Sequence, residues 1–293
     1  MSLTAALTKT VTRGLTRTLT SGISVGESLA GQVLADQMII DLQGWSVPMT
    51  STEEDAVRSF YDTCFPTTFW SKIKCLWFPI FGASGPSAID FKTVGSVGTF
   101  VNSWGFGSSG ATPTTGAYFN TGQSWTDWGL STGTGAIVTC TATTTDYGMF
   151  GGVWDASNSR ILMGTDTTPR LFYLNADNDS AADGTGGRVS VGSDKRAGGC
   201  FIGNRAAGGR QLFERKNSGF TVLEDWSSAS VGSDPGYDFY FGGYNSGGGV
   251  ADNNLSDYMC FGLTEGLTQS EAEVLSQAIY DFITDWGLGG ALT

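Results

Sequence analysis

Residues 258–286, YMCFGLTEGLTQSEAEVLSQAIYDFITDW, join an aromatic strand directly to a helix. Thr268 and Glu271 have the T-x-x-E spacing of a capping box, which marks the first turn of an α-helix. Beyond them apolar residues recur at intervals of three and four up to Trp286, and Gly287 is placed to end the helix. This stretch therefore predicts a strand, a short connection and one amphipathic helix.

The residues before this stretch have the composition of a sheet protein. The chain of 293 residues contains 43 glycines but only 7 prolines, and 12% of its residues are aromatic. Strand-like runs at 136–143, 170–174 and 237–241 are separated by Gly, Asn and Asp, as strands and turns of a sandwich are. We therefore expect a mostly β protein, an antiparallel β-sandwich, with the C-terminal helix packed against it.

The N-terminal third has a different character. A helix is predicted around residues 27–37, a second at 52–64, capped by Thr52 with Asp55, and a third at 70–77, ended by Pro79. The predicted organisation is an extended N-terminal arm at 1–45, a small helical module at 46–87 and the sandwich with its C-terminal helix at 88–293.

The first twenty residues alternate with a period of two. Threonine occupies the even positions from 8 to 20 except 14, and the odd positions alternate apolar with basic residues. This pattern indicates an extended arm that lies along the sheet edge or groove of a partner protein, although a flexible tail is the alternative for a terminus. The predicted partner-binding residues are Lys9, Val11, Arg13, Leu15, Arg17 and Leu19.

Charge and composition exclude several classes of function. The net charge of −12 argues against nucleic-acid binding, and no apolar run approaches the length of a membrane-spanning helix. The absence of histidine excludes Ser-His-Asp and Cys-His catalysis and His-ligated zinc. The five cysteines show no C-x-x-C spacing, so we expect reduced, buried thiols, with a Cys64–Cys75 bridge as the alternative.

Three further patterns of the sequence concern possible functional sites. A glycosidase of the lectin-like fold needs acids that alternate on one strand, and no such run is present, so we expect no enzyme activity. The acidic loop with Asp177, Asp179 and Asp183 is interpreted as a solvated hairpin loop, with calcium binding as the alternative and no other cofactor expected. Trp125, Trp128 and Trp154 lie in or beside turns and are candidates for stacking on a glycan.

Seven blocks of the chain occur in a distinctive order: Phe69–Ile73, Leu76–Pro79, Ile89–Lys92, Tyr118–Gly122, Phe201–Arg205, Phe241–Asn245 and Phe261–Thr268. They are similar to the segments W-x-K-L, L-Y-P (followed by G-G, here Phe81-Gly82), N-L-K, Y-x-D-T-G, F-x-x-x-N-R and L-G-A-x-N of tailed-phage virion proteins. The last block, with the helix that follows it, resembles their closing segment G-x-G-L-T-x-x-E-A-x-x-L-Y-x-A-V-Q-x-F. In that family a short helical module precedes a concanavalin A-like (LamG-type) jelly roll. Asp90 stands where the family has Asn. The resemblance covers roughly residues 50–287.

The resemblance implies a jelly-roll sandwich and a structural role. A non-enzymatic phage virion protein (a fibre, spike, collar or capsid decoration component) would be made in the host cytoplasm and displayed on the virion surface. Its partners would be other virion proteins, bound through the N-terminal arm, and further copies of itself. The alternative is a module that binds host-surface glycans, and the third interpretation is a glycosidase-type depolymerase.

Overall fold

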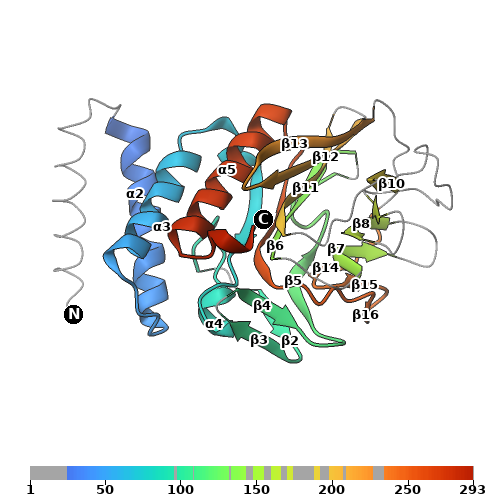
Figure 1. Ribbon diagram of the computed structural model, residues 1–293, viewed down its shortest axis with the longest axis horizontal. Coiled ribbons are helices and arrows are strands. Elements are labelled where there is room, and N and C mark those ends of the chain that lie inside the picture. Colours follow the sequence, from blue (N-terminus) through green and yellow to red (C-terminus); the bar gives the residue numbers. More distant parts are fainter. Residues whose placement is uncertain are drawn as a thin grey trace.

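The computed structural model shows three layers, a helical layer, an eight-stranded sheet and a seven-stranded sheet (Figure 1). It describes residues 25–95, 98–107, 109–131, 133–142, 148–154, 160–165, 170–173, 188–191, 198–206, 209–226 and 234–292. The mostly β, two-sheet sandwich with an N-terminal helical segment and one C-terminal helix confirms the predicted fold class.

The eight-stranded sheet is the middle layer. Its order is β13 (Gly219–Trp226), β12 (Gly209–Lys216), β11 (Gly199–Ala206), β6 (Gly135–Thr141), β17 (Tyr258–Thr264), β4 (Gly110–Pro113) and β3 (Trp104–Gly107), with β1 (Ile73–Trp77) also paired to β17. All seven residues of β17 are buried. A strand covered on both faces has no polar face, so its sequence is almost continuously apolar.

The seven-stranded sheet is the outer layer. Its order is β16 (Val250–Ala251), β15 (Tyr244–Asn245), β7 (Gly148–Trp154), β14 (Asp238–Phe241), β5 (Tyr118–Ser124) and β2 (Thr99–Val101), with β8 (Arg160–Thr165) paired to β7. A separate pair joins β9 (Arg170–Tyr173) to β10 (Arg188–Val191). The predicted strands at 136–143, 170–174 and 237–241 are therefore present as β6, β9 and β14.

Aromatic rings fill the space between the two sheets. The ring centroid of Phe119 lies 4.8 Å from those of Trp77 and Phe261, and Phe241 lies 4.7 Å from Phe261. These four rings come from β1, β5, β14 and β17, so one cluster joins strands from both sheets. Offset and edge-to-face ring pairs of this kind add about 1 kcal/mol each beyond their buried area.

The helices cover the other face of the eight-stranded sheet. They are α2 (Val25–Gly44), α3 (Ser51–Cys64) and α5 (Gln269–Asp285), of which α5 contacts β11 and β12, α3 contacts α5, and α2 contacts α3 (Figure 1). The other helical elements of the described residues are the short α4 (Ser84–Ser87) and the 3₁₀ turns η1 (Thr68–Lys72) and η2 (Gly289–Ala291). Phe60 of α3 and Phe282 of α5 meet with ring centroids 5.7 Å apart. The second core lies here, between helices and sheet.

Of the two capping boxes predicted from the sequence, one is correct and the other lies two residues too far along the chain. The capping box of Thr268 with Glu271 is present and starts α5 as predicted. The predicted cap of the second helix is wrong, because Thr50 and Glu53 form the capping box rather than Thr52 and Asp55. Both pairs have the same spacing, and the pair that is used places Ala56, Val57 and Phe60 against the core.

The helix predicted at 70–77 is wrong. Residues 68–72 form a 3₁₀ turn and residues 73–77 form strand β1, which pairs antiparallel with β17. Cys75 and Trp77 face the core between the sheets, whereas Leu76 and Phe78 belong to the core under the helices. Because two cores cover its two faces, the strand lacks the polar–apolar alternation that would have identified it.

The predicted organisation changes in two places. Helix α2 occupies Val25–Gly44, so this part of the range 1–45 is helical rather than extended, and it is longer than the helix expected at 27–37. Residues 1–24 lie outside the described residues. Strand β1 belongs to the sandwich sheet, and one core joins the helices to that sheet, so the boundary drawn at residue 88 does not separate two cores.

All five cysteines are buried and free, which confirms the reduced thiols and rules out the Cys64–Cys75 bridge in this structure. Cys140 is the register partner of both Cys200 and Cys260 on the neighbouring strands. Burial raises the pKa of the Cys140 thiol well above its ordinary value, and the neighbouring Cys200 raises it further. The three thiols therefore behave as small apolar side chains of the core.

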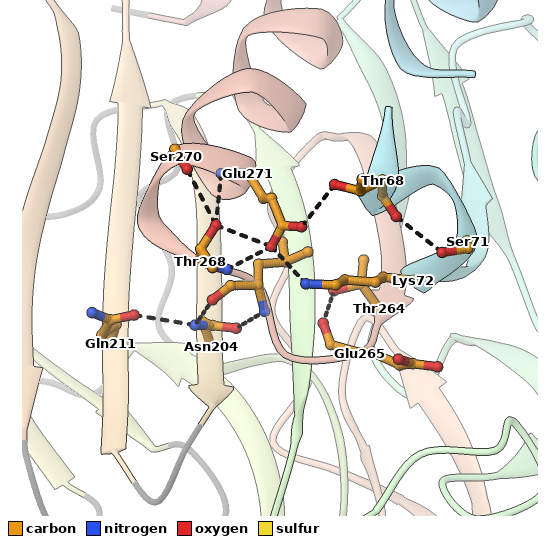
Figure 2. Close-up of polar contacts among 11 residues, drawn as sticks. Thr68, Ser71, Lys72, Asn204, Gln211, Thr264, Glu265, Thr268, Ser270 and Glu271 are labelled. Atoms are coloured by element: carbon orange, nitrogen blue, oxygen red, sulfur yellow. Dashed lines mark hydrogen bonds and ion pairs between the residues drawn. The ribbon is translucent and has the colours of Figure 1, made fainter. Parts of the chain in front are cut away.

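The start of α5 is fixed by polar contacts of Leu267, Thr268 and Glu271, named the clamp. Figure 2 shows its labelled members Asn204, Lys72, Thr268 and Glu271. Asn204 of β11 donates its Nδ2 to the Leu267 carbonyl and accepts the Leu267 N–H at its Oδ1, each over 2.8 Å. Lys72 of η1 lies 2.7 Å from Glu271, which also accepts the N–H of the N-cap Thr268. The clamp therefore ties α5 to β11 and to the turn before β1.

A buried carboxylate holds the turn after β1. Asp90 Oδ1 accepts the N–H groups of Leu76 and Lys92 over 2.8 and 2.9 Å, and Oδ2 accepts the Thr93 hydroxyl over 2.7 Å. Burial raises the pKa of Asp90 above the ordinary 3.8, although these three hydrogen bonds oppose the shift. Asp90 thus fixes the loop that follows β1 at a cost in desolvation.

We predict that Asn204→Ala lowers the free energy of unfolding by about 2–4 kcal/mol, because it leaves two buried backbone groups of Leu267 unpaired. Gln211→Ala is the matched control, since it removes only a 3.3 Å hydrogen bond to the outer side of Asn204 and should cost less than about 1 kcal/mol. Urea unfolding measures both variants. Equal losses would contradict the role of the clamp.

We predict that two substitutions of Asp90 have different effects on the free energy of unfolding. Asp90→Ala removes the acceptor of three hydrogen bonds and should lower stability by about 3 kcal/mol. Asp90→Asn keeps one oxygen for both backbone N–H groups and removes the buried charge. Because the folded-state pKa is raised, the Asp90 contribution is complete below the unfolded pKa and is lost as pH rises through the folded pKa.

Urea unfolding across pH 4–8 tests this pair of variants. The wild-type protein should lose stability, relative to Asp90→Asn, as pH rises above about 4. Identical pH dependence in the two proteins would show that the buried carboxyl carries no such penalty.

Candidate functional site

The outer face of the seven-stranded sheet carries the candidate site. Side chains alternate across a strand, so Phe119 of β5 and Phe239 and Phe241 of β14 point into the core between the sheets. Their neighbours Tyr118, Asn120, Asp238 and Tyr240 therefore point outward. These four residues are named the outer-face cluster.

Strand pairing brings the outer-face cluster together from two distant parts of the chain. Tyr240 is the register partner of Asn120 in the antiparallel pair of β14 and β5. The rings of Tyr118 and Tyr240 stack with centroids 4.1 Å apart and an interplanar angle of 21°. Asn120 Nδ2 donates to Asp238 Oδ2 over 3.2 Å. An aromatic pair and an amide–carboxylate pair thus lie side by side.

The surroundings of the cluster are polar and tightly arranged. Tyr240 is 5% exposed, while Tyr118, Asn120 and Asp238 are half-buried. Burial raises the pKa of Tyr240, and the hydrogen bond to Tyr118 and the nearby Asp238 raise it further. Asn245 of β15 donates to the Asp238 carbonyl over 2.9 Å and fixes that strand end. Tyr240 therefore stays a neutral phenol at ordinary pH.

A glycine of β7 lies between this cluster and a second aromatic pair on the same face. Gly152 of β7 is the register partner of both Tyr240 and Tyr244. A Cβ at Gly152 would approach the Ile161 carbonyl oxygen to 2.4 Å, so the position needs glycine. Beyond it, Trp154 and Tyr244 lie with ring centroids 5.5 Å apart, above Met149 and Leu162.

The three candidate tryptophans are not brought together. Trp125 is 3% exposed, donates its indole N–H to the Ser131 carbonyl over 2.8 Å, and packs against Phe239 in the core. Trp128 is half-buried and its ring centroid lies 6.1 Å from that of Trp77. Of the three, only Trp154 belongs to the outer face. A position beside a turn does not specify on which side of a sheet a tryptophan lies.

The other predicted site residues lie outside the described residues. These are the loop acids Asp177, Asp179 and Asp183 and the arm residues from Lys9 to Leu19. Among the side chains that the structure describes, no three metal-ligating groups gather as a metal site requires. In the same part of the chain, no helix combines the length and apolarity needed to cross a membrane.

Sequence reasoning missed Tyr118 and Tyr240, although their signal was present. Tyr240 lies between the inward-facing Phe239 and Phe241 of β14, and Tyr118 precedes the inward-facing Phe119 of β5. An aromatic residue on the outward face of such a strand is the exception to the inward-apolar rule. Their proximity was not visible, because it depends on β5 pairing with β14.

Comparison with known proteins defines the class of fold. Domain 4 of AbnA, a GH43 extracellular arabinanase from Geobacillus stearothermophilus solved in complex with arabinotriose, is similar to this chain with a TM-score of 0.50 and 14% identity, covering 70% of this chain and 98% of that domain. The likeness shows a shared β-sandwich architecture.

Two further solved structures are similar to this chain with TM-scores below 0.5. The CBM40 of the Ruminococcus gnavus IT-sialidase, bound to α2,3-sialyllactose, gives a TM-score of 0.38 at 12% identity, covering 50% of this chain and 83% of that one. The Trypanosoma rangeli sialidase in complex with sialic acid gives 0.44 at 12% identity, covering 70% and 32%. No protein-family model and no curated protein matches the sequence.

Proposed function

We propose that this protein binds glycans and that the outer-face cluster is the contact surface for the sugar. The observation that carries the proposal is the Tyr118–Tyr240 stack beside the Asn120–Asp238 hydrogen bond, on the sheet face that points away from the core. Jelly-roll sandwiches are widely used as lectin domains, so the scaffold suits this role.

The chemistry of the four side chains matches a sugar. The half-buried ring of Tyr118 offers an apolar surface to the C–H face of a pyranose or furanose, and the buried Tyr240 stacks against that ring. The amide of Asn120 and the carboxylate of Asp238 supply donors and acceptors for sugar hydroxyls.

The arabinanase domain adds support from the fold. That domain was solved with a bound sugar and shares the sandwich architecture across most of this chain. At 14% identity the comparison transfers no residues, so the proposed contacts rest on the geometry of this protein.

The proposed activity is binding without catalysis. The chain has no histidine, and its sequence lacks the alternating acids of a lectin-fold glycosidase. Of the described carboxylates, Asp90 accepts the backbone N–H of Leu76 and Asp238 accepts a hydrogen bond from the Asn120 side chain. Protein incubated with a bound glycan should release no reducing ends.

A second candidate function is a virion structural protein, supported by the seven sequence blocks. Three of them meet in the clamp of Figure 2, where Lys72, Asn204 and Thr268 come from different blocks. Motifs that converge on a fold-determining contact support the resemblance as a likeness of fold. A phage protein that displays a glycan-binding sandwich on the virion would combine both proposals.

We predict that Tyr118→Ala and Asp238→Ala each weaken glycan binding about tenfold or more, because each removes a direct contact to the sugar. A glycan array identifies the ligand and calorimetry measures Kd. Trp45→Ala is the matched control, since this aromatic side chain is 58% exposed but lies after α2, at the helical end of the molecule. Retained affinity in both cluster variants, or a silent array, would refute the site.

We predict for the virion proposal that a chain lacking residues 1–20 folds but fails to join particles. The reason is that the proposed partner contacts, Lys9 to Leu19, lie within the deleted segment. Particle incorporation is measured by co-sedimentation with tagged particles, and circular dichroism checks the fold. Normal incorporation of the truncated chain would contradict the anchoring role.

A further inference from the structure

Helix α2 is apolar on two opposite faces. One face, formed by Ala35, Met38 and Leu42, is buried. The other face carries Leu29, Val33 and Ile40, which are 44, 50 and 46% exposed. At 100° per residue these three side chains lie within a narrow stripe, named the α2 stripe, almost opposite the buried face. A stripe of branched apolar side chains on an outer helix indicates a docking surface.

The charge around the stripe selects a basic occupant. Residues 25–64, which form α2 and α3 and their connection, contain seven acidic side chains and one basic side chain, Arg58. Arg58 is already paired with Asp36 of α2 over 3.1 Å. Two copies of this layer would repel each other, so symmetrical packing of α2 against α2 is disfavoured.

The segment that precedes α2 has the complementary properties. Residues 1–24 contain Lys9, Arg13 and Arg17 and no acidic residue. They also carry an apolar residue at every fourth position, namely Leu3, Leu7, Val11, Leu15, Leu19 and Ile23. In an extended chain these positions share one face, and in a helix they form one continuous ridge, so an apolar line is available in either conformation.

Residues 1–24 are long enough to run along the α2 stripe, and they are joined directly to the first residue of α2. Helix α2 has 20 residues and is therefore about 30 Å long, whereas 24 residues span about 36 Å as a helix and about 80 Å when extended. The segment ends at Ser24, directly before Val25, the first residue of α2, so it needs only a reversal near Gly22 to run back along the helix. Covalent attachment gives it an effective concentration in the millimolar range, which a second copy would have to match.

We propose that in the isolated protein residues 1–24 fold back onto the α2 stripe of the same chain as a basic strap. The strap covers Leu29, Val33 and Ile40 and places its three cations beside the acidic helical layer. Because α2 lies at the end of the molecule away from the seven-stranded sheet (Figure 1), the strap leaves the outer-face cluster uncovered. It is also compatible with transfer of the arm to a partner in an assembly.

Limited trypsin digestion tests the strap, since Lys9, Arg13 and Arg17 are cleavage sites within it. The double variant Val33→Asp, Ile40→Asp should be cleaved at these sites about tenfold faster than the wild-type chain, because the open form becomes more populated. Val274→Asp is the matched control, a change at a 41% exposed valine on α5 that should leave the rate unchanged.

Two outcomes would overturn the proposal. Equal cleavage rates in the wild-type chain and the double variant would show that the stripe does not hold the segment. A wild-type oligomer in sedimentation that dissociates when residues 1–24 are removed would assign the stripe to a second copy.

A second measurement covers the case in which the double variant misfolds. The chain that begins at residue 25 should bind more of a hydrophobic dye than the full chain, because Leu29, Val33 and Ile40 lose their cover. No increase in dye fluorescence would also refute the strap.

Discussion

Burial of strand β17 on both faces is the constraint on which the rest of the structure depends. Tyr258, Phe261 and Leu263 face the seven-stranded sheet, whereas Met259 and Cys260 face the helices. A central strand with two apolar faces needs a cover on each side, so the sandwich requires its helical layer. The Asn204–Leu267 clamp fixes where that cover begins, only three residues after β17 ends (Figure 2). Helix α5 then lies across β11 and β12, with Ser276 accepting a hydrogen bond from Arg215 over 2.9 Å.

Three of the seven sequence blocks meet at this structural junction. Lys72, Asn204 and Glu271 come from separate parts of the chain and meet around the start of α5. Such residues determine a fold, and a fold can carry many functions. The resemblance therefore supports the architecture more directly than the biological role. The structural likeness to an arabinanase domain also concerns architecture.

The two ends of the molecule have different chemistry. The outer-face cluster lies on the seven-stranded sheet, where an aromatic pair adjoins an amide and a carboxylate. The helical end carries an acidic surface interrupted by the α2 stripe. Two cores and a central sheet lie between the outer-face cluster and the α2 stripe.

The sequence by itself determined the features that depend on neighbouring residues. The capping box of Thr268 with Glu271, the β character after residue 88, the reduced state of the cysteines and the exclusion of histidine chemistry could all be read from local spacing or composition. The tertiary structure decided the rest. Residues 73–77 became a strand because β17 was there to pair with them, which no local pattern records. Asn120 and Asp238, separated by 118 positions, became one site through the register of β5 with β14. Which side chains meet, and which face of a sheet stays open, depend on long-range pairing, whose partners a single sequence does not specify.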